Sequence, residues 1–257
     1  MIEIQDVYKT FNPGTIDENP SIRGLSLNIN DGDFVTVIGS NGAGKSTLMN
    51  LLSGSIRADT GKIIIAGQDV SLMPEHKRAR FIGRVFQDPK VGTASDLSVE
   101  ENLSLAMKRK DKRGLKFAIK KSYHELFKEK LSHLDLGLEE RLDDSIGLLS
   151  GGQRQAITLL MAGIIEPHIL LLDEHTAALD PKTADRVMKL TDQIIKEHKL
   201  TALMITHNME QAVQYGNRLI MLHQGQVALD IAGQKRQDLL VEDLLEQFSK
   251  VAENNSR

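Results

Sequence analysis

The stretch GSNGAGKST, which begins at Gly39, has the residue types and spacing of a phosphate-binding loop. The fixed positions of the pattern G-x-x-x-x-G-K-S/T hold Gly39, Gly44, Lys45 and Ser46. Glycines let successive backbone N–H groups curl around a polyphosphate, and the helix that follows adds free N–H groups and the positive end of its dipole. We predict that Lys45 reaches the β- and γ-phosphates, Ser46 holds Mg²⁺ and Thr47 donates near the α-phosphate. The loop residues predicted to bind ATP are Gly39, Ser40, Asn41, Gly42, Ala43, Gly44, Lys45, Ser46 and Thr47.

A pair of carboxylates, Asp173 and Glu174, ends the apolar run HILLLDE. The run predicts a buried strand, and ligands of open α/β sheets bind at the carboxyl ends of the strands. Asp173 is the natural partner for Mg²⁺. Glu174 is placed to orient and polarise the attacking water as a general base, a role worth ~10²–10⁴-fold in rate. By themselves, His207 at the end of LMITH and Gln87 in GRVFQDP fit a structural histidine and ordinary polar surface.

The stretch GLLSGGQRQA carries no nucleophile, metal ligand or acid–base pair. One interpretation is a turn with a helix N-cap at Ser150. The other is a second anion cradle, in which Ser150 offers a hydroxyl, Gly151 and Gly152 allow close backbone approach, and the following helix aims its N-terminus at a γ-phosphate.

Strand-like and helical patterns alternate along the chain and must position these groups. Strands are predicted at residues 2–11, 25–33, 34–39, 61–67, 168–174 and 202–207. Helical patterns begin after the phosphate loop, dominate residues 97–165 and recur at PKTADRVMKLTDQIIKEH and at VEDLLEQFSKVAENNSR. This alternation favours an α/β parallel sheet that is interrupted in the middle by a helical insertion.

Composition excludes several classes of site. The 257 residues carry a net charge of −3, so there is no bulk electrostatic argument for nucleic-acid binding. The absence of cysteine removes disulfides, thiolate metal sites and Cys nucleophiles. We see no signal peptide and no apolar run of the ~20 residues that a membrane helix needs, so we expect any membrane connection to run through a partner.

A basic stretch at residues 107–130 has two interpretations besides nucleic-acid binding. It fits a solvated helical face, and it also fits a surface near anionic lipid headgroups or near a membrane protein.

The ordered set GSNGAGKST, Gln87, LSGGQRQ, ILLLDE, AALD and His207 resembles the ATP-binding-cassette (ABC) ATPases over essentially the whole chain. The resemblance implies an α/β fold: a P-loop NTPase core, with a mostly parallel sheet flanked by helices, N-terminal antiparallel β strands and an inserted helical subdomain. It implies one ATPase domain over residues 1–257, with the nucleotide-binding core at 1–87 and 166–257 and the helical signature subdomain at about 88–165.

The resemblance also implies roles for single residues. Gln87 matches the Q-loop residue that contacts Mg²⁺ and the water, and His207 matches the switch histidine that contacts the γ-phosphate. Asp180 matches the D-loop aspartate, which helps to form the opposite site in a dimer. Phe11 is the candidate for stacking on adenine, with Tyr8 a weaker one. The catalytic set is Glu174, His207 and Gln87, and the Mg²⁺ set is Ser46, Gln87 and Asp173.

The signature residues Ser150, Gly151, Gly152 and Gln153 are then expected to cover the ATP that a second copy holds. Two positions depart from the family pattern: His175 replaces the usual proline after the catalytic glutamate, and Ala177 replaces the usual serine before the D-loop. His175 puts the shape of the turn after Glu174 in doubt.

The function implied by the resemblance is that of an ATP-hydrolysing transporter subunit, with ATP and Mg²⁺ as cofactors. The segment IGRVFQDPKVGTASDLSVEENL looks most like bacterial importers of amino-acid-type solutes. The expected partners are integral-membrane permeases, a second copy of the chain and an extracytoplasmic substrate-binding protein, without nucleic acid. The expected location is peripheral, on the cytoplasmic face of the membrane. An exporter, lipid-extraction or cell-division ATPase is one alternative, and a non-transport ATPase acting on nucleic acid or the ribosome is another.

Overall fold

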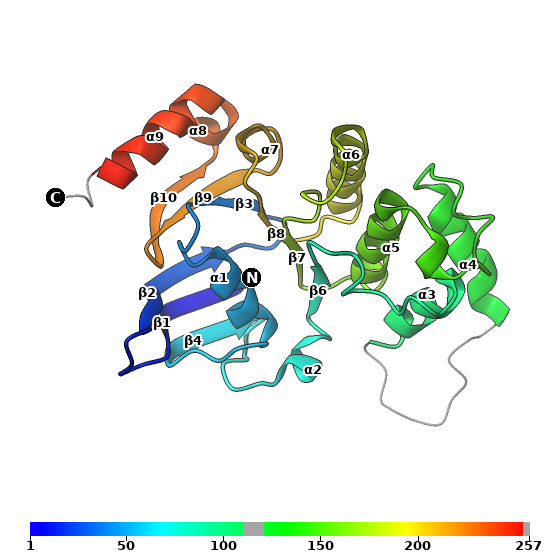
Figure 1. Ribbon diagram of the computed structural model, residues 1–257, viewed down its shortest axis with the longest axis horizontal. Coiled ribbons are helices and arrows are strands. Elements are labelled where there is room, and N and C mark those ends of the chain that lie inside the picture. The colour runs from blue at the N-terminus through cyan, green and yellow to red at the C-terminus, as the bar shows by residue number, and fades with distance from the viewer. Residues whose placement is uncertain (110–120, 254–257) are drawn as a thin grey trace.

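Two β-sheets and the helices packed on them form the fold in the computed structural model, which describes residues 1–109 and 121–253 (Figure 1). The strands are β1 (Ile2–Phe11), β2 (Asn19–Ile29), β3 (Phe34–Ile38), β4 (Thr60–Ile65), β5 (Gln68–Asp69), β6 (Ile82–Val85), β7 (Ile169–Asp173), β8 (Ala202–Ile205), β9 (Arg218–His223) and β10 (Gln226–Ala232). The helices are α1 (Lys45–Ser53), α2 (Glu75–Arg78), α3 (Val99–Met107), α4 (Lys121–Ser132), α5 (Gly151–Gly163), α6 (Pro181–Glu197), α7 (Met209–Gln214), α8 (Gln234–Gln237) and α9 (Val241–Glu253), with a 3₁₀ turn at Ile146–Leu148.

The larger sheet has the strand order β10-β9-β3-β8-β7-β6, and all its pairs are parallel except β10 with β9. In the register, Ile205 of β8 pairs with both Val37 of β3 and Asp173 of β7. The carboxyl ends of β3, β7 and β8 therefore lie at one edge. This register brings the phosphate loop, the two carboxylates and the segment leading to His207 to the same place.

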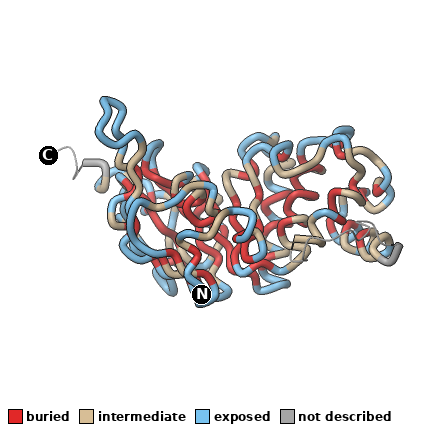
Figure 2. The backbone as a smooth tube through the Cα atoms, turned by 90° about the horizontal axis from the view of Figure 1, so that it is seen from below, coloured by how far each residue is buried: buried red, intermediate tan, exposed pale blue. Residues whose placement is uncertain are grey.

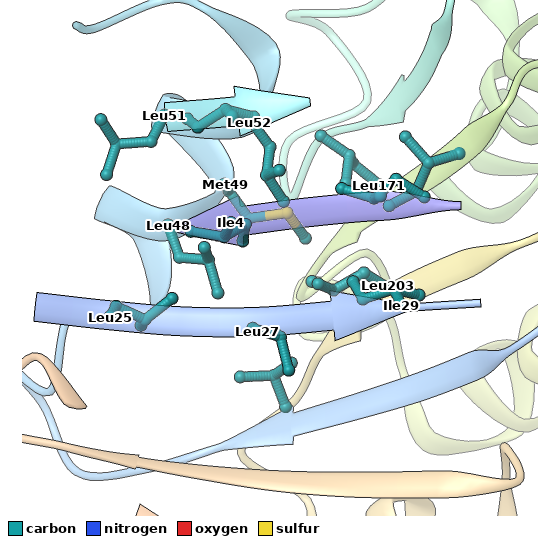
Figure 3. Close-up of a cluster of buried hydrophobic side chains, with 14 of the residues drawn as sticks. Ile4, Leu25, Leu27, Ile29, Leu48, Met49, Leu51, Leu52, Leu171 and Leu203 are labelled. Atoms are coloured by element: carbon teal, nitrogen blue, oxygen red, sulfur yellow. The ribbon is translucent and has the colours of Figure 1, made fainter. Parts of the chain in front are cut away.

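The smaller sheet, β2-β1-β4-β5, is antiparallel. Helix α1 lies between the two sheets, where its apolar face joins one buried cluster with both (Figure 3). In that cluster Met49 of α1 packs with Ile4 of β1 on one side and with Leu171 and Leu203 of the larger sheet on the other. Because α1 packs against both sheets, its N-terminus, which follows the phosphate loop, is held in place.

Helices α3, α4 and α5 follow β6 in the chain and lie together beyond the β6 edge of the larger sheet (Figure 1). A second buried cluster runs from these helices into the sheet, joining Leu103 and Phe127 to Leu170 and Leu172. Figure 2 shows buried residues in the part of the molecule that contains the sheets and also in the helical part. The helical insertion is therefore packed onto the sheet through shared apolar side chains.

The predicted fold is confirmed, and the local predictions differ from the structure in a few places. Strand β2 begins at Asn19, earlier than the alternation at residues 25–33 indicated, because the preceding residues pair with β1. Strands β6, β9 and β10 were not predicted. Of the basic stretch at 107–130, residues 110–120 lie outside the described residues. In the described part of the chain, no helix has the length and apolar character needed to span a membrane.

Candidate nucleotide-binding site

The phosphate loop joins β3 to α1 and has the backbone of an anion cradle. Gly42 and Gly44 adopt positive φ angles of 80° and 100°, and Gly44 is the N-cap of α1 without any side-chain cap hydrogen bond. The first amides of the helix are therefore not capped by the protein's own side chains, which suits an anionic ligand. A Cβ on Gly44 would lie 2.7 Å from the carbonyl oxygen of Ser21, so this position has no room for a side chain.

Lys45 is folded back into its own loop. Its Nζ donates to the carbonyl oxygens of Gly39 at 2.8 Å and of Ser40 at 3.0 Å, and the residue is 5% exposed. Burial lowers the pKa of Lys45, while the nearby carboxylates of Glu174 and Asp173 act in the opposite direction. The ammonium group is thus held among the loop carbonyls and the two carboxylates, where a phosphate would find a poorly hydrated cation.

The carboxylate pair lies at the end of β7, as predicted, and both side chains are mostly buried, at 19% and 15% exposed. Glu174 has a positive φ of 45°, an uncommon conformation for a residue with a side chain. Its Oε1 lies 2.5 Å from Nε2 of His207, in ion-pair contact with the imidazole ring. The structure therefore brings the predicted general base and the predicted switch histidine together.

The oxygen donors predicted for Mg²⁺ come from three elements. Ser46 is exposed in the first turn of α1, Asp173 ends β7, which α1 contacts, and Gln87 is exposed just after β6, the neighbour of β7. A hydroxyl, a carboxylate and an amide are hard oxygen ligands of the kind that Mg²⁺ binds together with phosphates and water. Within the described residues there is no cluster of three or more His, Cys, Asp or Glu that could hold a metal alone.

Phe11 ends β1 and is half-buried, with Nζ of Lys9 5.7 Å from its ring centroid. Lys9 is itself fixed by an ion pair with Asp59 at 2.6 Å. Tyr8, the weaker candidate for adenine, is exposed, and its hydroxyl packs against Gly24. Phe11 therefore has a cation near its ring, whereas the hydroxyl of Tyr8 lies beside Gly24.

The signature loop has a different construction, because it caps itself. The hydroxyl oxygen of Ser150 accepts from the backbone N–H of Gln153 at 3.3 Å, and Oε1 of Gln153 accepts from the N–H of Ser150 at 3.2 Å. This capping box still leaves the hydroxyl proton of Ser150 available for donation. Gly151 is exposed, whereas Gly152 is buried against α6, where a Cβ would lie 2.2 Å from Cγ2 of Thr183.

The hollow beside Ser150 contains no phosphate-loop residue among the described residues. It is lined by Leu134–Leu136, Ser150, Gly152, Gln153 and residues of α6, Thr183 and Arg186 among them. Asp180, the predicted D-loop aspartate, is exposed and caps α6 by accepting from the N–H of Thr183 at 3.1 Å. Hydrogen bonding with the side chain of Thr183, and then with its backbone N–H, lowers the pKa of the Asp180 carboxyl. The signature and D-loop groups therefore gather on one surface rather than over the phosphate loop of their own chain.

Comparison with known proteins gives the family. The profile of the ABC transporter family matches residues 22–177. The chain belongs to this family. It is 45% identical over 253 residues to the tyrosine transport ATP-binding protein of Clostridioides difficile (strain R20291), a match that covers 96% of this chain and 98% of that protein.

Two further matches agree with this assignment. The methionine import ATP-binding protein MetN of Clostridium tetani is 34% identical, over 86% of this chain and 66% of that protein. A solved ATP-binding cassette, in a dimeric post-hydrolysis state bound to ADP and Pi, has a TM-score of 0.74 and 27% identity, over 90% of this chain and 98% of that one. The predicted family, the P-loop fold and the ATPase activity are confirmed: this ABC ATPase is the ATP-hydrolysing subunit of a membrane transporter.

Two contacts of the ABC ATPase were missed from the sequence. Arg84 of β6 reaches Asp173, with Nη2 3.3 Å from Oδ2. Gln155, which is fully buried in α5, donates from Nε2 to the carbonyl oxygen of Phe86 at 3.1 Å and so ties the signature helix to the residue before Gln87. No local pattern indicated either contact, because the partners lie 89 and 69 residues apart in the chain.

His175, the departure from the family pattern, is buried at the turn after Glu174 in this ABC ATPase. Its Nε2 lies 3.0 Å from Oγ1 of Thr191 on α6, and that hydroxyl donates onward to the carbonyl oxygen of Val187. The imidazole therefore donates, and burial lowers the pKa of His175 to about 4. A neutral, hydrogen-bonded histidine can thus hold this turn on α6.

Proposed function

We propose that this chain powers the import of an amino acid, with tyrosine as the first candidate. The observation that carries the proposal is the 45% identity to a tyrosine transport ATP-binding protein along nearly the full length of both chains. The methionine import relative supports the amino-acid class more broadly. The ATPase would work with integral-membrane permeases and an extracytoplasmic binding protein, at the cytoplasmic face of the membrane, and without nucleic acid.

We assign the binding of the ATP triphosphate to the phosphate loop. Its glycine-rich backbone and the uncapped first turn of α1 offer N–H groups, and Lys45 supplies the buried cation. Phe11 stacks on the adenine, a contact worth ~1–3 kcal/mol by analogy with base–aromatic stacking. Ser46, Asp173 and Gln87 are the residues assigned to Mg²⁺, which when bound neutralises charge on the β- and γ-phosphates.

We assign to Glu174 the activation of the water that attacks the γ-phosphate. Its carboxylate orients this water and accepts its proton, and the ring of His207, with Nε2 2.5 Å from Oε1, holds the carboxylate in place. The turn that carries Glu174 is held to α6 through His175. These contacts restrict how the carboxylate can rotate and so support its assignment as the general base.

A second copy of the chain is assigned the other half of each site. Among the described residues, no phosphate-loop residue lines the hollow beside Ser150, and a related cassette has been solved as a dimer. In the proposed dimer, the Ser150 hydroxyl and the N-terminus of α5 face the γ-phosphate held by the partner's phosphate loop.

Transport in a reconstituted system tests the import proposal. A tagged chain is purified from membranes with its permease, placed in proteoliposomes with ATP on the ATPase side, and assayed for uptake of labelled tyrosine. We expect ATP-dependent uptake that unlabelled tyrosine suppresses and that the variant Glu174→Gln abolishes. Efflux from the ATPase side would indicate an exporter, and recovery of nucleic acid or ribosomes instead of a permease would contradict a transport role.

A further inference from the structure

Arg84 connects three elements of the nucleotide site. It lies in β6, three residues before Gln87, and its side chain is 14% exposed. The guanidinium donates from Nη2 to Oδ1 of Asn50 at 2.9 Å and from Nη1 to Oγ of Ser53 at 3.2 Å, both on α1. The same Nη2 reaches Oδ2 of Asp173 on β7 at 3.3 Å. One side chain therefore links the strand of Gln87, the helix of the phosphate loop and the predicted Mg²⁺ ligand.

The polar residues of α1 that Arg84 contacts share a face with Ser46. Asn50 and Ser53 follow Ser46 by four and seven residues, and this spacing aligns side chains along one side of a helix. Ser46 is the hydroxyl assigned to Mg²⁺ at the start of that stripe. The first residue of this face that Arg84 contacts, Asn50, therefore lies about one helical turn, ~5.4 Å, beyond Ser46.

Arg84 differs from a purely structural arginine in the same region. Arg78 is 1% exposed, and Nε, Nη1 and Nη2 all donate to backbone carbonyl oxygens. Arg84 instead contacts side chains, lies 4.6 Å over the ring of Phe86, and leaves its buried Nε without a hydrogen-bond partner among the described residues. An unpaired buried donor lowers the stability of the folded state. The guanidinium of Arg84 is therefore placed so that its terminal nitrogens contact Asp173 and α1, although Nε then has no hydrogen-bond partner among the described residues.

We propose that Arg84 is a positioning residue for the metal ligand Asp173. It holds Oδ2 and ties the carboxylate to α1, which fixes the distance and direction between Asp173 and Ser46. The contact with Arg84 engages Oδ2, so Oδ1 would be the oxygen available to Mg²⁺. This inference rests on the proposed assignment of Asp173 and Ser46 to Mg²⁺. Charge alone would have the opposite effect, because a nearby cation repels a second cation, so the sign of the mutational effect separates positioning from electrostatics.

The test compares Arg84→Met with Arg80→Met as the matched control. Methionine keeps much of the length and the contact with the aromatic ring but removes the guanidinium. Arg80 is also stacked on a ring, 4.5 Å from the centroid of Phe81, but it is exposed and hydrogen-bonds to Gln68. The readout is the equilibrium affinity for ATP, measured in EDTA and over a titration of MgCl₂, in a Glu174→Gln background that keeps the nucleotide intact.

We expect Arg84→Met to raise the Mg²⁺ concentration for half-maximal tightening of ATP binding by about tenfold, the range seen when a partner of a metal ligand is lost. Affinity in EDTA should stay within about twofold of the parent, and Arg80→Met should change neither value. Arg84→Lys, which keeps the charge but not the planar fork, should restore only part of the response. A lower half-saturation in Arg84→Met, or an equal loss with and without Mg²⁺, would overturn the proposal.

Two further variants keep the test decisive. If Arg84→Met does not fold, as judged by thermal unfolding, Arg84→Lys and Asn50→Ala are measured instead and should shift the Mg²⁺ dependence in the same direction. Asp173→Asn separates this inference from the assignment beneath it. If Asp173→Asn retains the parent response to Mg²⁺, the assignment of Asp173 to the metal is wrong. If Asp173→Asn loses the response while the Arg84 variants keep it, only the role of Arg84 is wrong.

Discussion

The phosphate loop and the signature loop both place glycine and serine at the start of a helix, yet they leave different groups available. At the phosphate loop, Gly44 caps α1 without a side chain, and a buried Lys45 lies inside the loop. At the signature loop, the capping box of Ser150 and Gln153 satisfies part of the helix end, and the preceding Leu148 is 73% exposed. The first loop leaves uncapped amides and a buried cation within its own chain, as the proposed phosphate site requires, whereas the second has a side-chain cap and is the loop that we propose serves another chain.

The largest expected effect comes from removing the cation of the phosphate loop. Lys45→Ala should weaken ATP binding on the order of 100-fold, because charge-assisted hydrogen bonds to the phosphates are lost. Equilibrium binding of ATP measures this, with Lys62→Ala on exposed β4 as the control. Undiminished binding and hydrolysis would mean that this loop is not the phosphate site.

The next effect separates binding from turnover. Glu174→Gln should reduce ATP hydrolysis by ~10²–10⁴-fold, because the amide cannot accept the proton of the water. ATP binding should persist, and gel filtration with ATP should show a trapped dimer in which the two loops meet across the nucleotide. Hydrolysis at the parent rate would require a different base.

A bulky charge at the signature loop tests whether that loop serves another chain. Ser150→Arg should reduce hydrolysis on the order of 100-fold by blocking the γ-phosphate side of the partner's site, while each phosphate loop still binds ATP. Ser249→Arg, at an exposed position of α9, is the control. Because the capping box is also lost, at a cost of ~1 kcal/mol, thermal unfolding is measured alongside. Full activity in this variant would contradict the shared-site interpretation.

A pair of alanine substitutions compares the backbone constraints on the phosphate loop and on the signature loop. Gly44→Ala places a Cβ 2.7 Å from the Ser21 carbonyl oxygen at a φ of 100°, so it should lower the free energy of unfolding by ~1–3 kcal/mol. Gly151→Ala meets only Leu179, at 3.4 Å, and should change stability by less than ~0.5 kcal/mol. Urea denaturation measures both. Equal losses would show that the two glycines face similar constraints.

A smaller, pH-dependent effect concerns the turn after Glu174, which packs on the same helix α6 as the signature loop. His175 is neutral when folded, with its pKa lowered from 6.5 to about 4, so the unfolded chain binds more protons between these values. Stability should therefore fall as the pH drops from 6.5 towards 4, by about 2 kcal/mol at pH 5. His175→Asn should flatten this part of the curve. Urea unfolding at pH 7 and pH 5 measures it, and an unchanged slope would contradict the role of His175.

Much of the site followed from local patterns. The glycine spacing of residues 39–47, the carboxylates at the end of an apolar run and the serine before two glycines each lie within a few residues, where backbone geometry and side-chain chemistry determine one another. The apolar core strands β3, β7 and β8 were equally visible, because buried parallel strands form continuous apolar runs. Strands β9 and β10 were missed, and β6 is only four residues long, too short for a clear pattern.

The amino-acid sequence by itself determined the glycine-rich loop between β3 and α1, the place of two carboxylates at the end of β7 and the family. Only the tertiary structure decided that Arg84 reaches Asp173, that Gln155 holds the carbonyl of Phe86, and that Gly152 is small because Thr183 packs against it. The physical reason is that these contacts join residues distant in the chain, and their partners are selected by how strands and helices pack rather than by the residues beside them.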